Sequence, residues 1–255
     1  MREIIYKVVD LFTFGRGLKK TFNNMYDVRL PTRYINYFPS NYEEENFNFL
    51  KNSVSTGSVI LDIGSHIGLF SIIASRLVKS SGKVYAFEPS PTTFSVLKKT
   101  IAINNVDKSV FPFQKAVGAN EGTIQFYVSN DSVDNSNSLV NYLSDRELNG
   151  IDVAITTTDI FVQEQQINKI DFIKIDVEGA EYDTLIGAKN TLLKFRPNCM
   201  VGIHPPAIKA KGDDLLKIYK LIKECNYKLL VNGKEITKEY FLSNNELIEL
   251  HIIPE

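Results

Sequence analysis

Carboxylates and glycines follow an apolar run early in the chain, in a pattern that suits ligand binding. The loop Asp62-Ile63-Gly64-Ser65-His66-Ile67-Gly68 comes after a short apolar run and before a helical pattern. Gly64 permits a turn with positive φ, and the helix that starts after Gly68 offers unpaired N–H groups. Asp62 would repel a pyrophosphate and attract a cation, and the spacing departs from GxGxxG. The loop therefore favours a nucleoside-like ligand with a positive group and no phosphates.

A second acidic residue follows the next apolar run, in Glu88-Pro89-Ser90. A carboxylate at this place can accept hydrogen bonds from both hydroxyls of a ribose. Acidic residues often end strands, so the residue alone is a weak signal. Together, the two motifs predict a site for adenosine without a diphosphate tail.

Further along the chain, Lys174-Ile175-Asp176-Val177-Glu178-Gly179-Ala180-Glu181 follows another apolar run. One carboxylate, Asp176 or Glu178, can balance the charge of a cationic ligand. The other can take the proton of a neutral hydroxyl. A plain helix start with acidic residues in its first turn is the alternative, and it is less favoured at this sheet edge.

Gly202-Ile203-His204-Pro205-Pro206 follows the next strand. His204 could act as a base or orient an acceptor, and a purely structural role is equally open. Asp176, Glu178, Glu181 and His204 could also form an oxygen-rich metal site, but their spacing is not diagnostic and a site without metal is favoured.

From Ser58 onward, short apolar runs alternate with helical patterns. This alternation predicts an α/β domain with a mostly parallel sheet and helices on both faces. Pro112 suggests an edge position for the strand at 110–113. A single helix is expected over 182–195. Only residues 232–245 separate the last two strands, so these are expected to pair antiparallel.

Five motifs occur in a set order: Asp62 to Gly68, Glu88-Pro89, Ala116-Val117-Gly118, Asn135-Ser136-Asn137-Ser138-Leu139 and Lys174 to Glu181. This order resembles the FkbM-type family of S-adenosylmethionine-dependent methyltransferases, over about residues 57–255. The resemblance implies a Rossmann-like class I methyltransferase fold, with a seven-stranded sheet whose last strand is antiparallel. It also implies S-adenosylmethionine as the cofactor.

The resemblance assigns roles to individual residues. Asp62, Gly64 and Gly68 would flank the methionine part of the cofactor, Glu88 would hold the ribose, and the segment from Gln114 would lie near the adenine. The cofactor-binding set that it implies is Asp62, Gly64, Ser65, His66, Gly68, Glu88, Pro89, Gln114, Ala116, Val117 and Asp176. Asp176, Glu178 and His204 are the expected catalytic residues. The family usually has a glutamate two residues before this histidine, whereas this chain has Gly202.

Composition narrows the class of protein. The 255 residues include 29 Lys and Arg against 30 Asp and Glu, a formal net charge of −1, and 44% are hydrophobic. These values are typical of a globular protein and argue against a dedicated nucleic-acid binder. No apolar stretch approaches the roughly 20 residues of a membrane span. Leu11 and Phe12, followed by basic residues, allow peripheral membrane association at most, and the charged N-terminus does not resemble a signal peptide.

Residues 1–56 are rich in aromatic side chains and are expected to form a helical cap or lid on a methyltransferase domain at 57–255. Cys199 and Cys225 fit neither a CxxC nor a zinc pattern, which predicts buried thiols in a reducing, cytoplasmic compartment.

The sequence thus predicts an S-adenosylmethionine-dependent O-methyltransferase that acts on a hydroxyl of a glycan or a small natural product. The alternatives are an NAD-dependent oxidoreductase on a similar sheet and a methyltransferase-like binding module without catalysis. The missing GxGxxG motif counts against the first, and Gly202 alone suggests the second.

Overall fold

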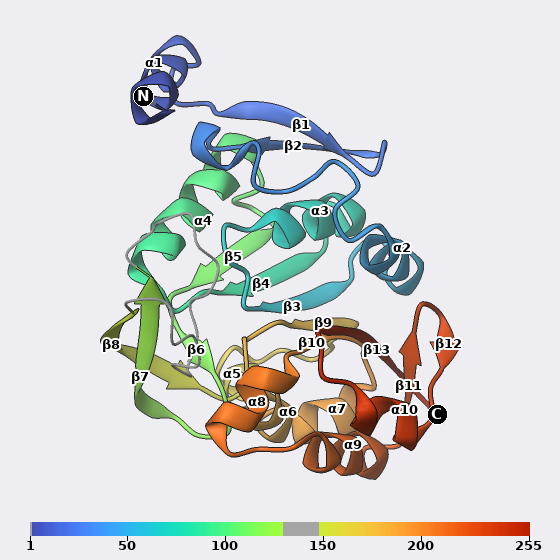
Figure 1. Cartoon of the computed structure of the whole chain (residues 1–255). Coiled ribbons are helices and arrows are strands. Elements are labelled where there is room, and N and C mark those ends of the chain that lie inside the picture. The colour runs from blue at the N-terminus through green and yellow to red at the C-terminus, as the bar shows by residue number, and fades with distance from the viewer. Residues whose placement is uncertain (1, 130–147) are drawn as a thin grey trace.

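The computed structural model describes residues 2–129 and 148–255 (Figure 1). The predicted motif at Asn135 to Leu139 lies outside the described residues. An eight-stranded sheet runs through the centre of the chain. In spatial order its strands are β12 (Lys234–Glu235), β11 (Tyr227–Val231), β13 (Ile248–Pro254), β10 (Asn198–Ile203), β9 (Phe172–Ile175), β3 (Val59–Ile63), β4 (Lys83–Phe87) and β5 (Val110–Phe113).

Seven of these strands are the ones that the sequence predicts, and the two-residue β12 adds an eighth at the edge. Five consecutive strands of the sheet run parallel to one another, namely β10, β9, β3, β4 and β5. β13 is antiparallel to both β10 and β11, which confirms the predicted pairing of the last two strands. β5 lies at the other edge, as Pro112 indicates, because proline has no N–H group to donate to a neighbouring strand.

Two smaller sheets accompany the main one. β6 (Ala116–Val117), β8 (Leu148–Thr156) and β7 (Gly122–Ser129) form a three-stranded sheet, in which β7 and β8 pair antiparallel. β1 (Leu18–Phe22) and β2 (Tyr26–Leu30) form an antiparallel hairpin near the N-terminus. The prediction of a cap made only of helices is therefore wrong for residues 18–30. Phe22, Val28 and Leu30 of this hairpin are buried, so tertiary packing on the domain stabilises strands that local sequence did not reveal.

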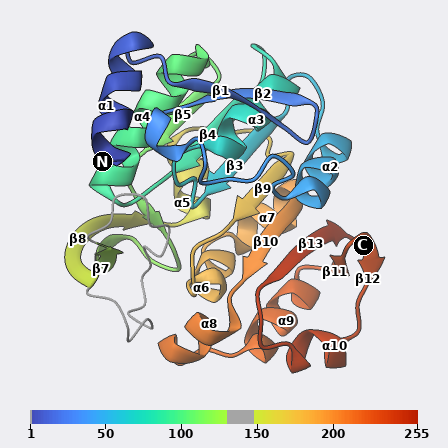
Figure 2. The same ribbon diagram turned by 45° about the horizontal axis from the view of Figure 1, so that its top comes forward.

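Helices cover both faces of the sheet, as predicted. α2 (Glu44–Ser53), α3 (Leu69–Val78) and α4 (Pro91–Asn104) pack with the hairpin on one face. On the other face lie α5 (Thr158–Glu164), α6 (Glu181–Ile186), α7 (Lys189–Phe195), α8 (Pro205–Lys211), α9 (Leu215–Glu224) and α10 (Lys238–Ser243). Figure 2 shows α1 (Arg2–Phe12) beside α4, where Asp10 and Lys99 form an ion pair at 3.6 Å. The hairpin and a short 3-10 helix, η1 (Thr32–Tyr34), follow α1 in the chain. No helix in the described residues is long and apolar enough to cross a membrane.

The single helix predicted over 182–195 is wrong, because the structure breaks it into α6 and α7 at Gly187. A Cβ atom at Gly187 would lie 2.0 Å from the carbonyl oxygen of Gly118, so the chain passes too close to its neighbour for any side chain. Asp159 then accepts hydrogen bonds from the backbone N–H groups of Asn190 and Thr191, at 3.0 and 2.7 Å. This carboxylate satisfies the first turn of α7 and lets a new helix begin there.

Local sequence explains the remaining helix starts near the site. Ser90 caps α4 by accepting a hydrogen bond from the Thr93 N–H group, and Pro91 occupies the first position, where its missing N–H has no effect. The body of α3 is buried on nearly all sides, so its apolar sequence needs no polar face.

Cys199 and Cys225 are free and buried, which confirms the prediction that both thiols are buried.

The strand order reverses direction between β3 and β9, because the chain first adds β4 and β5 on one side and later adds β9 and β10 on the other. Loops at such a point leave the sheet toward opposite faces and open a crevice at the carboxyl ends of the strands. The predicted motifs after β3, β4, β9 and β10 all lie at this edge.

Candidate active site

Backbone hydrogen bonds attach the loop after β3 to the end of β4. The backbone N–H groups of Gly64 and Ser65 both donate to the carbonyl oxygen of Phe87, at 3.1 and 2.9 Å. Gly64 has a φ of 80°, and a Cβ atom there would lie 1.8 Å from the carbonyl oxygen of Asp176. Only glycine therefore allows this loop to pass the end of β9, which is the turn that the sequence predicts.

Glu88, directly after β4, is held by two backbone donors. The N–H of His66 donates to Oε2 at 3.1 Å and the N–H of Ser90 donates to Oε1 at 2.9 Å. The side chain is buried, and this burial raises the pKa of Glu88 to about 7 despite those two hydrogen bonds. The carboxylate is thus fixed in place while each oxygen keeps lone pairs for a further donor.

A buried lysine connects the loops after β3 and β9. Nζ of Lys174 donates to the Gly64 carbonyl oxygen at 2.9 Å and lies 3.3 Å from Oδ2 of Asp176 and 3.6 Å from Oδ1 of Asp62. Although burial opposes the charge, Asp176 and Asp62 raise the pKa of Lys174, so its ammonium is retained. The position of Lys174 in its sequence motif did not indicate this role.

Asp62 is fully buried and faces this lysine rather than the open crevice. Oδ2 of Asp62 also accepts a hydrogen bond from the Ser71 hydroxyl at 2.5 Å, whereas Oδ1 has no hydrogen-bond donor. Burial raises the pKa of Asp62, and Lys174 partly offsets this effect. The expected attraction of Asp62 for a cation is real, but the cation that it meets is a side chain of the same protein.

Asp176, Glu178 and His204 come together at the ends of β9 and β10, as predicted. Nε2 of His204 lies 3.7 Å from Oδ1 of Asp176 and 3.9 Å from Oε1 of Glu178. Its Nδ1 lies 2.7 Å from Oε1 of the fully buried Glu181, which also accepts from the Gly179 N–H at 3.0 Å. Glu181 thus sets the orientation of the imidazole.

The surroundings of His204 and Asp176 give these two side chains opposite charges. Burial opposes the charged form of His204, but Glu181 and the neighbouring carboxylates raise the pKa of His204 to about 9. Burial likewise opposes ionisation of Asp176, yet Lys174 and His204 hold the pKa of this carboxyl below its ordinary value. At neutral pH His204 is therefore a cation and Asp176 an anion, and the expectation that His204 accepts a proton is not supported at this pH.

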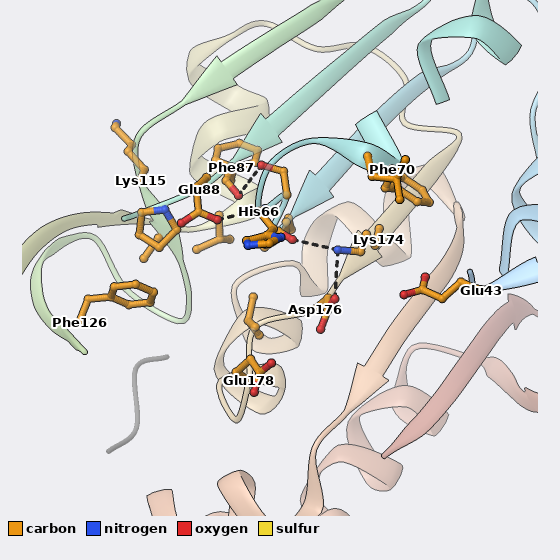
Figure 3. A pocket seen from close by; sticks show the side chains of 18 of the residues that line it. Glu43, His66, Phe70, Phe87, Glu88, Lys115, Phe126, Lys174, Asp176 and Glu178 are labelled. Carbon is orange, nitrogen blue, oxygen red and sulfur yellow. Dashed lines mark hydrogen bonds and ion pairs between the residues drawn. The ribbon is translucent and has the colours of Figure 1, made fainter. Parts of the chain in front are cut away.

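Asp176 and Glu178 border a cavity of about 110 Å³ that opens to solvent (Figure 3). The residues predicted from sequence that line it are Gly64, Ser65, His66, Glu88, Pro89, Ala116, Val117, Asp176 and Glu178.

Four predicted residues do not line the cavity. Asp62 lies behind it against Lys174, and Gly68 begins α3, where a Cβ atom would lie 2.6 Å from the Leu97 side chain. Gln114 is exposed, and its neighbour Lys115 lines the cavity instead. His204 stands behind Asp176 and Glu178 and contacts both.

Residues of the N-terminal segment, for which the sequence predicts only an aromatic-rich cap or lid, also line the cavity. Phe38, Tyr42, Glu43 and Phe47 all contribute side chains from before the first strand of the main sheet. The crowding of aromatic residues was the available signal, but no local pattern distinguished Glu43 from the other acidic residues at the start of α2.

No group of three or more His, Cys, Asp or Glu side chains within residues 2–129 and 148–255 is arranged to hold a metal ion.

Comparison with known proteins identifies the family. A model of the methyltransferase FkbM domain matches residues 62–229, which is more than half of the chain. The chain belongs to this family. It is a methyltransferase, which confirms the resemblance seen in the sequence and sets aside the oxidoreductase alternative.

Two curated relatives are similar in sequence to part of this methyltransferase. The hexuronic acid methyltransferase AglP of Haloferax volcanii is 26% identical over 196 residues, which cover 77% of this chain and 72% of the relative. The 2-O-methyltransferase NoeI of Sinorhizobium fredii is 29% identical over 150 residues, which cover 54% of this chain and 60% of the relative.

The fold has a counterpart among solved structures. The FkbM methyltransferase from Methylobacillus flagellatus superimposes with a TM-score of 0.51 at 16% identity, over 78% of this chain. The match spans only 44% of that longer protein. At this level of identity the likeness concerns the fold, and it agrees with the predicted class I methyltransferase architecture.

Proposed function

We propose that this methyltransferase uses S-adenosylmethionine and methylates a hydroxyl of a sugar, a glycan or a small natural product. The observation that carries the proposal is the position of Glu88. Its carboxylate is buried at the end of β4, is fixed by two backbone N–H groups and borders the cavity. Such a carboxylate fits a ribose diol, which offers two donors side by side.

The residues present fit the cofactor in other respects. Gly64 leaves space where its Cβ would otherwise meet the backbone, and the Gly64–Gly68 loop lacks the GxGxxG spacing that binds a pyrophosphate. Bound S-adenosylmethionine supplies an electrophilic methyl group on a positively charged sulfur. Asp176 stays ionised beside Lys174 and would balance positive charge near the ends of β9 and β3.

Glu178 is the residue that we propose accepts the acceptor's proton. It lines the cavity, and its left-handed backbone, with a φ of 52°, turns the chain at the end of β9. Protonated His204, held by Glu181, would position Asp176 and Glu178 through their charges. Holding the acceptor oxygen in line with the methyl group is the main contribution expected of such a site.

The acceptor class rests on the relatives and on charge. AglP is a hexuronic acid methyltransferase, and NoeI is a 2-O-methyltransferase. The net charge of −1 supports a small-molecule or glycan acceptor over a nucleic acid. The two free buried cysteines support the proposal of a cytoplasmic, reducing compartment.

Calorimetry with S-adenosylhomocysteine and NAD, followed by turnover with a panel of saccharides and hydroxylated natural products, tests this function. We expect binding of the first ligand alone and release of S-adenosylhomocysteine with at least one acceptor. Glu178→Gln should slow turnover while cofactor affinity is kept, and the exposed Glu246→Gln serves as a matched control. Binding without turnover on any acceptor would favour a non-catalytic binding module, and a Glu178→Gln variant at full rate would remove Glu178 from the mechanism.

A further inference from the structure

Glu43 brings a carboxylate into the cavity from outside the segment that matches the family model. It precedes α2 with a left-handed φ of 44°, and its side chain lines the cavity. Figure 3 shows its carboxyl group turned toward Lys174 and Asp176, at the opposite end of the cavity from Glu88. The residue therefore faces the reaction edge of the sheet, although it lies before position 62 in the chain.

Asn46 holds Glu43 in this position. Its Nδ2 donates to Oε2 of Glu43 at 3.3 Å and to Oε2 of Glu249, on β13, at 2.9 Å. Its Oδ1 accepts from Nε2 of His251 at 2.8 Å. Burial lowers the pKa of His251 to about 4, so the ring is neutral and its single N–H fixes which way the amide of Asn46 points.

The sheet register leaves this side of the cavity open toward Asp176. Glu249 is the cross-strand partner of Gly202 in the β10–β13 pair, so both residues face the same side of the sheet. A Cβ atom at Gly202 would lie 3.2 Å from Oδ1 of Asp176. Because Gly202 has no side chain, nothing from position 202 separates Glu249 and Glu43 from Asp176.

Acceptor groups prevail at this end of the cavity. Burial raises the pKa of Glu43, and Asp176 adds to this effect, whereas Tyr42, Lys174 and Asn46 lower it. Lys174 is already engaged with Gly64, Asp62 and Asp176. A ligand carboxylate would meet like charges here, whereas a hydroxyl or an ammonium would supply donors, and Phe47 and Phe70 add aromatic faces that suit a cation.

We propose that Glu43, held by Asn46, is a specificity-determining residue that accepts a hydrogen bond from a hydroxyl or ammonium group of the ligand and keeps carboxylate groups away. The inference rests on the proposed function. The donor group is either the ammonium of the cofactor's amino-acid tail, with the carboxylate of that tail directed away from Glu43, or a group of the acceptor, for which it implies a neutral or amino sugar in place of a hexuronic acid.

Two ligand sets distinguish these sources. Calorimetry compares S-adenosylhomocysteine with 5′-methylthioadenosine, which lacks the amino-acid tail. Saturation-transfer NMR on the protein, with and without S-adenosylhomocysteine, compares the methyl glycosides of glucose, glucosamine and glucuronic acid. The variants are Glu43→Gln and Glu249→Gln, and the matched control is Glu45→Gln, which changes an exposed residue of the same helix turn.

If the cofactor tail supplies the hydrogen-bond donor, Glu43→Gln weakens the binding of S-adenosylhomocysteine about tenfold and leaves the binding of 5′-methylthioadenosine unchanged, since a hydrogen bond to a charged group is lost. If the methyl acceptor supplies the hydrogen-bond donor, the wild type binds the glucose or glucosamine glycoside more tightly than the glucuronide, and Glu43→Gln reduces this preference. Glu249→Gln should act in the same direction with a smaller effect, and Glu45→Gln should have none.

Equal weakening of both nucleosides would indicate a structural effect and would overturn the inference. So would unchanged nucleoside affinities together with no preference against the glucuronide. Failure of the proposed function is recognised separately, because then the wild type would bind neither nucleoside, and the glycosides alone would decide the role of Glu43.

Discussion

Nζ of Lys174 lies 3.6 Å from Oδ1 of Asp62, and both side chains are buried, with exposed fractions of 8% and 0%. This pair joins the two central strands, β3 and β9, in which Asp62 and Lys174 are direct cross-strand partners. The negative charge of Asp62 is therefore balanced within the protein, and its side chain does not line the cavity.

Replacing Lys174 with methionine should destabilise the protein strongly. The variant removes the only cation in contact with Asp62 among the described ion pairs, and it leaves two carboxylates close together. Removing one partner of a buried ion pair typically costs about 3–5 kcal/mol. Urea denaturation should show a loss of this order in the free energy of unfolding.

The control for that variant is Lys169→Met. Lys169 pairs with Asp171 at 3.2 Å, but its side chain is 50% exposed, so the expected cost is only about 0–1 kcal/mol. The double variant Lys174→Met/Asp62→Asn should recover part of the lost stability because it removes one unpaired charge. Equal stability of Lys174→Met and Lys169→Met would contradict the proposed role of the pair.

Gly64→Ala should disrupt the site, because the added Cβ atom would lie 1.8 Å from the Asp176 carbonyl oxygen. Gly212→Ala provides the comparison, since Gly212 also has a positive φ, of 89°, and no atom within 4 Å of the added Cβ. The strain of the left-handed conformation alone costs about 1–2 kcal/mol. Gly64→Ala should lose more than Gly212→Ala in urea denaturation, and only Gly64→Ala should lose affinity for S-adenosylhomocysteine. Similar losses of stability would show that the backbone at 64 can move aside.

Glu88→Gln should weaken the binding of S-adenosylhomocysteine about tenfold, because an ionised hydrogen-bond acceptor is replaced by a neutral amide that has one oxygen fewer. The raised pKa of Glu88, at about 7, adds a pH signature. Wild-type affinity should fall as the pH is lowered through 7, since the carboxylate then becomes protonated, and this component should be absent in Glu88→Gln. Calorimetry between pH 5.5 and 8.5 measures both effects, with the exposed Glu164→Gln as control. The same pH profile in wild type and Glu88→Gln would argue against a ribose-binding role.

Because of His204, the protein should become less stable as the pH rises into the alkaline range. The folded protein raises the pKa of His204 from 6.5 to about 9. The stabilising charge is therefore fully present below pH 6.5 and is lost as the pH rises through 9. Thermal unfolding should occur at progressively lower temperature between pH 6.5 and 9.5, and His204→Asn should be less stable at pH 6.5 with a flatter profile over this range. A wild-type profile without such a decline would show that His204 is neutral in the folded state.

The predictable part of this protein consists of features that neighbouring residues determine. Apolar runs with strand and helix periods gave the seven predicted strands and the mostly parallel sheet. The topology rule for ligand sites then placed Glu88, Asp176 and Glu178 at one edge. Gly64 was predictable for the same reason, because a sharp turn directly after a buried strand requires a residue that tolerates positive φ.

Contacts between distant segments account for what local patterns missed. The hairpin at residues 18–30 and the break between α6 and α7 depend on packing against other parts of the chain, and neither has a strong local signal. Lys174 was visible in its motif, but its balance of charge with Asp62 arises only when β3 and β9 become neighbours. The sequence by itself determined that Glu88, Asp176 and Glu178 meet at the carboxyl edge of the sheet. Only the tertiary structure decided their charges and their orientation toward the cavity, because burial and long-range contacts, such as the one between Asn46 and Glu249, set both.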